Sequence, residues 1–143
     1  MILWKWHDWL DQPKYDEQWH LDDMADELAE YQGETKLLKK WSEASDVVYT
    51  YTRSKWSGHS GVEFPLGRMA YMFGTLYMYP KYSLRQLFFQ RAGKKAGMTE
   101  RLICVRNPKK THKLHVIAEE NSLDKQAFQK VCKKQLKRWI LLP

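Results

Sequence analysis

The chain has 143 residues, of which 43% are apolar and 29% charged, and it contains only two cysteines. This composition excludes an intrinsically disordered chain and a disulfide framework. Residues 1–10 lack the unbroken apolar run of a signal peptide, and no later segment is apolar enough to cross a bilayer. We therefore expect one soluble domain over residues 1–143, intracellular (cytoplasmic or nuclear), with no membrane partner.

The charge is divided between two parts of the sequence. Residues 1–50 hold 5 Lys and Arg against 12 Asp and Glu, a net −7, whereas residues 51–143 hold 19 against 5, a net +14. A basic stretch of this length is typical of proteins that bind a polyanion, because Lys and Arg that neutralise phosphates release condensed counterions. The acidic part is compatible with a solvated face, a segment that folds back over the basic surface, or a docking site for a protein.

Three helices are expected in the acidic part. Apolar residues recur near helical period at Ile2, Trp6, Trp9 and Leu10, and Pro13 ends that run. Residues 16–31 place their apolar positions on one face and their acidic positions mostly on the other, and Gly33 follows as a stop. Residues 34–44 form a third short helical pattern.

The middle of the chain predicts one strand and two helices. Residues 47–52 are β-branched or aromatic throughout, which favours a strand and supplies a minor β element. After a Gly-rich loop at 57–61, Pro65 suits the first turn of a helix that Pro80 would end. Ser83 would cap the next helix, and Gly93 or Gly97 would close it.

The last forty residues predict a pair of helices. Residues 101–106 fit either a short strand or a helical turn, and we favour the turn. Helices over 108–120 and 123–139, joined at Asn121 and Ser122 with Ser122 as the cap, have the spacing of a helix-turn-helix, although any basic helical hairpin has the same pattern. The predicted fold is mainly α: a single compact domain with a minor β element and a C-terminal helix-turn-helix.

The solvent side of the last helix would be rich in Lys and Gln, which bind phosphates and base edges. We expect nucleic-acid contacts from cations of the basic part, namely Arg53, Lys55, Arg91, Lys94, Lys95, Lys109, Lys110, Lys113, Lys125, Lys130, Lys133, Lys134 and Lys137. Residues 90–97 combine glycines with cations, so their backbone N–H groups could cradle a phosphate. A plain helix stop explains the same residues, and the segment lacks the spacing of a nucleotide-binding loop.

Two further arrangements of reactive side chains were weighed. His112 and His115, with Cys104 and Cys132, could supply four zinc ligands, but each Cys stands alone in sequence, so we expect no metal and no cofactor. Residues 49–59 mix Tyr and Trp with Arg53, Lys55 and His59. They fit a half-buried strand, a surface that stacks bases, or a metal-free nuclease in which His59 is the general base. We expect no catalytic residue.

These patterns together predict a small, non-enzymatic nucleic-acid-binding protein that uses its basic C-terminal surface, with duplex DNA favoured over RNA. The alternative is an inhibitor or adaptor from a virus or mobile element. Such a protein would bind a host protein through its basic and aromatic surface, entering an acidic groove that normally receives nucleic acid.

Overall fold

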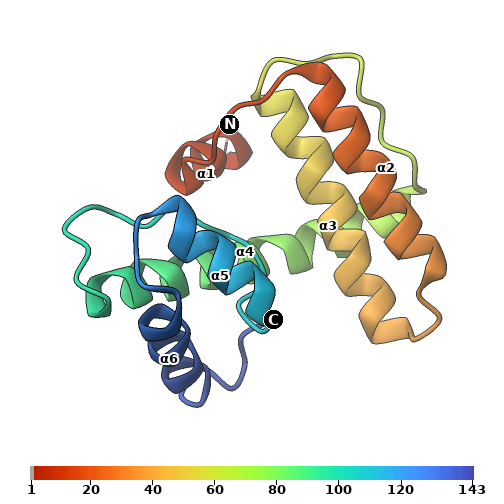
Figure 1. The fold of residues 1–143 in the computed structure, drawn as a ribbon. Helices are drawn as coiled ribbons and strands as arrows, with labels where there is room; N and C mark the ends of the chain where they lie inside the picture. The colour runs from red at the N-terminus through yellow and green to blue at the C-terminus, as the bar shows by residue number, and fades with distance from the viewer. Residues whose placement is uncertain (1) are drawn as a thin grey trace. The chain divides into compact units, whose positions relative to one another are not determined.

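A computed structural model describes residues 2–143. Over these residues the chain forms six α-helices and no β-strand (Figure 1). The helices are α1 (Ile2–Leu10), α2 (Glu17–Gly33), α3 (Leu37–Trp56), α4 (Arg68–Lys95), α5 (Thr111–Glu120) and α6 (Lys125–Leu136). The mainly α prediction is confirmed, and the predicted β element is wrong.

The chain folds into two compact units, Met1–Pro80 and Lys81–Pro143, with α4 contributing to both. The first unit holds 8 Lys and Arg against 13 Asp and Glu, a net −5, and the second holds 16 against 4, a net +12. The division of charge in the sequence therefore follows the structural division closely. The prediction of a single domain over residues 1–143 stays a prediction.

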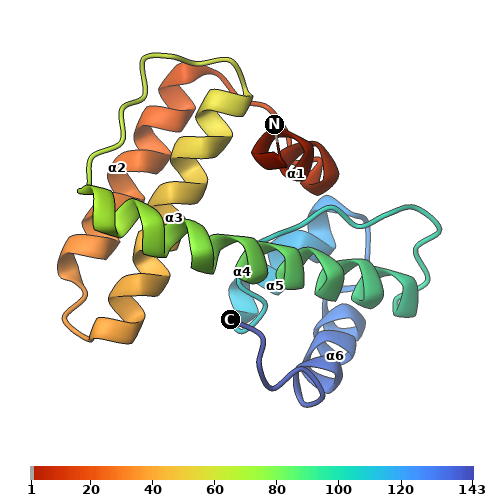
Figure 2. The same ribbon diagram turned by 180° about the vertical axis from the view of Figure 1, so that it is seen from behind.

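In the first unit α2 and α3 lie side by side and antiparallel (Figures 1 and 2). The Asp16 carboxylate caps α2 by accepting a hydrogen bond of 2.8 Å from the Trp19 amide. Helix α1 is attached to α3 by two polar contacts: His7 Nε2 lies 2.9 Å from Thr52 Oγ1, and Trp56 Nε1 donates to Asp8 at 2.8 Å. The predicted N-terminal helix is confirmed.

The short helix and the strand that the sequence predicted at 34–44 and 47–52 are one helix, α3. Its second half is buried on almost every side, including Val47, Val48 and Tyr49 in succession. A helix buried all round shows no 3.6-residue pattern. Since β propensities span only about 1 kcal/mol per residue, packing overrides the β-branched composition here.

Helix α4 differs from prediction at its start and in the middle. It begins at Arg68 instead of Pro65 and continues through Pro80, so the predicted stop at Pro80 and the cap at Ser83 are wrong. An interior proline costs about 3 kcal/mol, and residues buried on either side, Met78 and Tyr82, offset that cost. The helix ends before Gly97, whose φ of 91° is the left-handed conformation of a glycine stop.

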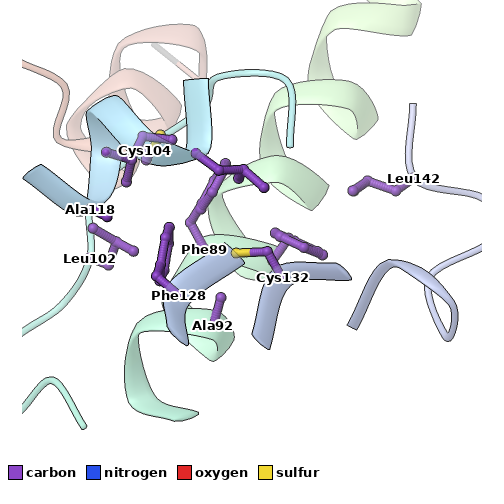
Figure 3. Close-up of a cluster of buried hydrophobic side chains, with 11 residues drawn as sticks. Phe89, Ala92, Leu102, Cys104, Ala118, Phe128, Cys132 and Leu142 are labelled. Carbon is purple, nitrogen blue, oxygen red and sulfur yellow. The ribbon is translucent and has the colours of Figure 1, made fainter. Parts of the chain in front are cut away.

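The core of the second unit gathers apolar side chains of α4, α5 and α6, with Phe89 and Ala92 facing Phe128 and Cys132 (Figure 3). Residues 101–105 cross this core in an irregular conformation, so the favoured helical turn is wrong. The side chain of Gln86 replaces a strand partner there: its amide nitrogen donates to the Leu102 oxygen at 3.1 Å, and its oxygen accepts from the Cys104 amide at 3.2 Å.

Candidate nucleic-acid interface

Helices α5 and α6 form the predicted helical hairpin. The Leu123 amide donates to the Ala118 oxygen at 2.8 Å, and the Asn121 side chain donates to the Ile117 oxygen at 2.8 Å, which closes α5. Helix α6 is capped by Asp124, which accepts from the Ala127 amide at 2.7 Å, and the predicted cap at Ser122 is wrong. The hairpin is present, and its use as a DNA-binding helix-turn-helix stays a prediction.

Helix α6 has a buried side and a cationic side. Phe128, Cys132 and Gln135 are buried, at positions three and four apart. The opposite side lines an open hollow formed by Gln126, Ala127, Gln129, Lys130, Lys133, Lys134 and Lys137. The four Lys residues of this list are exposed, so they are available to a polyanion.

The first turn of α6 is less free. Lys125 is paired with Glu119 at 3.2 Å, and Gln129 lies 2.6 Å from His115 Nε2 through its side-chain oxygen. Glu119 and Asp124 add negative charge at the start of the helix, and the side chain of Gln129 is already engaged with His115. The available positive charge therefore lies toward the C-terminal half of α6.

A second row of cations lies beside that half. Arg91 and Lys95 are one turn apart on α4; Lys134 is in the last turn of α6, and Arg138 follows directly after its C-cap. Desolvation, followed by the neighbouring charges of Arg91, Arg138 and Lys134, lowers the pKa of Lys95. These four side chains form a cluster that we call the cationic quartet. Sequence reasoning missed Arg138, although its spacing from Lys134 indicated a shared face.

The remaining cations predicted in the second unit are on other parts of its surface. Lys94 is exposed in the last turn of α4. Lys109 and Lys110 are exposed just before α5, and Lys113 is half-buried in its first turn.

The glycine-rich segment does not offer a backbone cradle for phosphate. The amides of Ala96, Gly97 and Met98 donate to the α4 carbonyls of Ala92, Lys94 and Gly93, at 2.9, 3.2 and 3.0 Å. These N–H groups are therefore used to end the helix, and the helix-stop interpretation is confirmed. Arg91, Lys94 and Lys95 can reach an anion through their side chains alone.

The two predicted contacts of the first unit, Arg53 and Lys55, are held in intramolecular contacts. Arg53 is only 7% exposed: it donates to the Pro13 oxygen at 2.6 Å and its guanidinium lies 4.9 Å from the centre of the Trp19 ring. Lys55 donates to the Ser60 oxygen at 2.8 Å. Because the expected strand is a helix, these residues do not alternate with Tyr on one open face. We leave both out of the proposed interface.

His59 also makes a structural contact. Its Nε2 donates to the Tyr15 oxygen at 2.8 Å, which joins the 57–61 loop to the start of α2. Tyr49, in the same segment, is buried and lies against His7. Of the interpretations weighed for residues 49–59, the one with Tyr turned inward agrees best with this geometry.

The four residues weighed as zinc ligands do not converge. Among residues 2–143, the one group of three or more side chains close enough to share a metal ion is Glu27, Glu30 and Glu43, which is acidic, partly exposed and in the first unit. Both cysteines are buried, and desolvation raises the pKa of Cys104 to about 11 and that of Cys132 to about 12. Without a bound metal, both thiols are therefore protonated at neutral pH.

Comparison of the chain with protein-family models, curated proteins and solved structures gave no match. Within residues 2–143, no helix combines the length and apolar character needed to span a membrane.

Proposed function

We propose that the second unit binds nucleic acid, without catalysing a reaction, through the cationic side of α6 and the cationic quartet. The observation that carries this proposal is the concentration of exposed cations, at Lys130, Lys133, Lys134 and Lys137, on the side of α6 opposite its buried residues, in a unit of net charge +12. Packing in the core restricts which residues can occupy the buried side of α6. It places no such requirement on the exposed side, so the four Lys there are not explained by the fold.

Phosphate binding is the chemistry that this surface supports best. The four α6 Lys lie within about 11 Å along the helix, at 1.5 Å per residue. This length matches a few successive phosphates of a duplex, which carries one charge per about 1.7 Å of axis. Lys is a flexible point charge without the planar fork of Arg, so it suits phosphate contacts of low sequence specificity.

Duplex DNA is favoured over duplex RNA for a geometric reason. The major groove of B-DNA, about 12 Å wide, admits an α-helix, whereas the major groove of A-form RNA is too narrow for side chains to read. Helix α6 projects its Lys row from a rigid hairpin, which suits a convex element entering or lying along a wide groove. Because the Asp124 carboxylate at the N-terminus of α6 would repel phosphates, we expect the C-terminal half of the helix to contact them.

The same face would also fit an acidic protein groove, and one experiment separates the two partners. We would measure the affinity for random duplex DNA between low and physiological salt. If all seven cations of the α6 Lys row and the quartet contact phosphates, the slope of log K against log salt should be about −6, and about −3 if half of them do, since each contact contributes about 0.9. No binding at low salt, or a slope near zero, would reject nucleic acid and favour the acidic groove.

A further inference from the structure

The first unit has a hollow of about 490 Å³ that is lined by residues of α1, α3, the start of α4 and the 57–61 loop. Each of the three helices contributes a Trp or Tyr to the lining, namely Trp4, Tyr51 and Tyr71, and α3 also contributes Lys55. Sites for small molecules usually have volumes of about 300–1,000 Å³, with apolar and aromatic walls and a few polar groups. This hollow, which we call the aromatic hollow, has that size and that lining.

Two of the three rings are held by packing, and the third leaves a face open. Tyr51 and Tyr71 meet edge to face at 6.3 Å, and the Phe64 ring lies 5.4 Å from Tyr51 and 5.1 Å from Tyr71. Trp4 is 42% exposed, and among residues 2–143 its ring contacts no other aromatic ring. An open indole face beside fixed rings can stack on a flat ligand at a low entropy cost.

The lining of the aromatic hollow is positively charged, although the first unit is acidic. Among residues 2–143, the lining includes Lys55 and no Asp or Glu. Lys55 donates one hydrogen bond of 2.8 Å, to the Ser60 oxygen, and forms no ion pair within the described residues. The carboxylate that reaches the loop next to Ser60, that of Glu17, already accepts from the Gly61 amide at 2.9 Å. An ammonium has three donors, so two remain for a ligand.

A second positive charge lies close to this lining. Arg53 is only 7% exposed and forms no ion pair within residues 2–143. Desolvation, followed by the charge of Arg53, lowers the pKa of His20, and Asp16 opposes this with a smaller effect. The His20 ring lies 5.3 Å from the ring of His59, which lines the aromatic hollow. The surroundings of the hollow therefore favour an anionic ligand over a neutral or cationic one.

We propose that the aromatic hollow binds a small aromatic carboxylate, with its ring against Trp4 and its carboxylate on the Lys55 ammonium. Lys55 Nζ lies 5.3 Å from the centre of the Tyr51 ring, so an anion on this ammonium keeps an attached ring beside the aromatic wall. A carboxylate is favoured over a phosphate because the first unit has a net charge of −5, which opposes a second negative charge. The proposal is independent of nucleic-acid binding by the second unit.

The test compares three probes that share one ring system and differ in charge: 2-naphthoate, the neutral 2-naphthamide and the cationic 2-(aminomethyl)naphthalene. Chemical-shift titrations of the ¹⁵N-labelled full chain, at physiological salt and neutral pH, measure each affinity. We expect 2-naphthoate to bind with a Kd below about 1 mM and to shift the indole N–H signal of Trp4. The amide should bind at least about tenfold more weakly, because it cannot accept a charge-assisted hydrogen bond, and the amine more weakly still.

Three variants of the chain identify the contacts. Lys55→Met keeps the alkyl stem without the charge, so it should weaken 2-naphthoate by at least about tenfold and leave 2-naphthamide nearly unchanged. The retained affinity for the amide would show that the hollow is intact. Trp4→Leu should weaken both probes by about threefold or more, as loss of a stacked ring does. Lys39→Met, the same substitution at an exposed lysine of α3 outside the lining, should change neither affinity.

Four results would overturn the proposal: no binding of 2-naphthoate, equal affinities for the naphthoate and the amide, equal effects of Lys55→Met on the two probes, or binding lost with Lys130→Glu and Lys134→Glu. The last result would show that the anion binds to the basic second unit. Adenosine monophosphate tests the phosphate alternative. If it binds more tightly than 2-naphthoate and loses affinity in Lys55→Met, the hollow is a phosphate site and the carboxylate assignment is wrong.

Discussion

The side chain of Gln135 in α6 donates a hydrogen bond of 2.8 Å to the main-chain oxygen of Phe88 in α4, 47 residues earlier. Four residues after Gln135, the Trp139 ring meets the Phe88 ring edge to face at 5.7 Å. Because these contacts attach the end of α6 to α4, they bring Lys134 beside Arg91 and Lys95. The buried side-chain amide of Gln135 thus helps to position the exposed cations of the quartet.

Gln135 should tolerate an apolar replacement better than a charged one. It is 1% exposed, and its side-chain oxygen has no hydrogen-bond partner within the described residues, 2–143. Gln135→Met loses one hydrogen bond and removes that oxygen, so we expect a cost of about 0.5–1.5 kcal/mol. Gln135→Glu buries a charge and should cost more than about 2 kcal/mol at neutral pH. Urea unfolding measures both, with the exposed Gln126→Glu as control; equal stability of the two Gln135 variants would contradict the packing described.

Gly74 should not accept a methyl group. A Cβ there would lie within 2.8 Å of Val48 Cγ2 and the Ala44 oxygen, so Gly74→Ala should destabilise the chain by about 1–3 kcal/mol despite the better helix propensity of Ala. Gly67→Ala is the matched control, because nothing lies within 4 Å of its added Cβ. Thermal unfolding of both variants is the measurement. If Gly74→Ala melts at or above the parent temperature, α3 and α4 do not cross as closely as described.

The positions of α1 and α2 followed from the sequence because their patterns are local. In α2, an Asp cap, an apolar face and a glycine end are each visible within a few residues. The second half of α3 and the passage of α4 through Pro80 depend on contacts far along the chain. Burial on all sides erases the periodicity of α3, and packing outweighs the proline, so neither could be predicted from local patterns.

The candidate interface, like the fold, could be predicted only in part from the sequence. The Lys row of α6 follows from helical spacing alone, and the structure leaves it exposed. Arg53 could not be excluded from sequence, because a lone Arg among aromatic residues fits both a phosphate contact and the contact with Trp19 and Pro13 that it makes. The spacing of Arg138 from Lys134 is visible in the sequence, but its place near Lys95 of α4 depends on the long-range contact between Gln135 and Phe88.

Acid should destabilise the first unit through two buried histidines. Burial, followed by the charge of Arg53, lowers the pKa of His7 and of His20 from about 6.5 to about 4. Between these values the unfolded chain binds more protons than the folded chain, so the stabilisation is complete above pH 6.5 and is lost as the pH falls toward 4. Each pH unit between the folded and unfolded pKa corresponds to about 1.4 kcal/mol.

His20→Leu isolates one of these groups. Among residues 2–143, both ring nitrogens of His20 lack a hydrogen-bond partner, so an apolar side chain of similar size should be neutral or stabilising at pH 7. The variant should also lose less stability than the parent between pH 6.5 and pH 4, in urea titrations at each pH. Burial raises the pKa of Asp23, which acts in the opposite direction and is common to both proteins. If the stability of the variant and that of the parent fall in parallel with pH, His20 is not held neutral in the folded chain.

The two sides of α6 should respond differently to substitution. Phe128 is fully buried, so Phe128→Ala should cost about 3–5 kcal/mol and unfold or nearly unfold the second unit. Lys130 and Lys134 are exposed, so their reversal to Glu should change stability by no more than about 0.5 kcal/mol each. Chemical denaturation of the two variants checks this contrast. A large loss of stability in the Lys variant would mean that these side chains serve the fold.

The central claim is that the exposed cations of the second unit bind phosphates, and the salt dependence of duplex DNA binding by Lys130→Glu with Lys134→Glu tests it most directly. We predict an affinity at least about tenfold lower and a slope of log K against log salt shallower by about 2, since each lost contact removes about 0.9. Lys36→Glu with Lys39→Glu makes the same change in net charge in the first unit and should keep both the affinity and the slope of the parent. Parental binding by the α6 variant, or equal losses in the two variants, would contradict the claim.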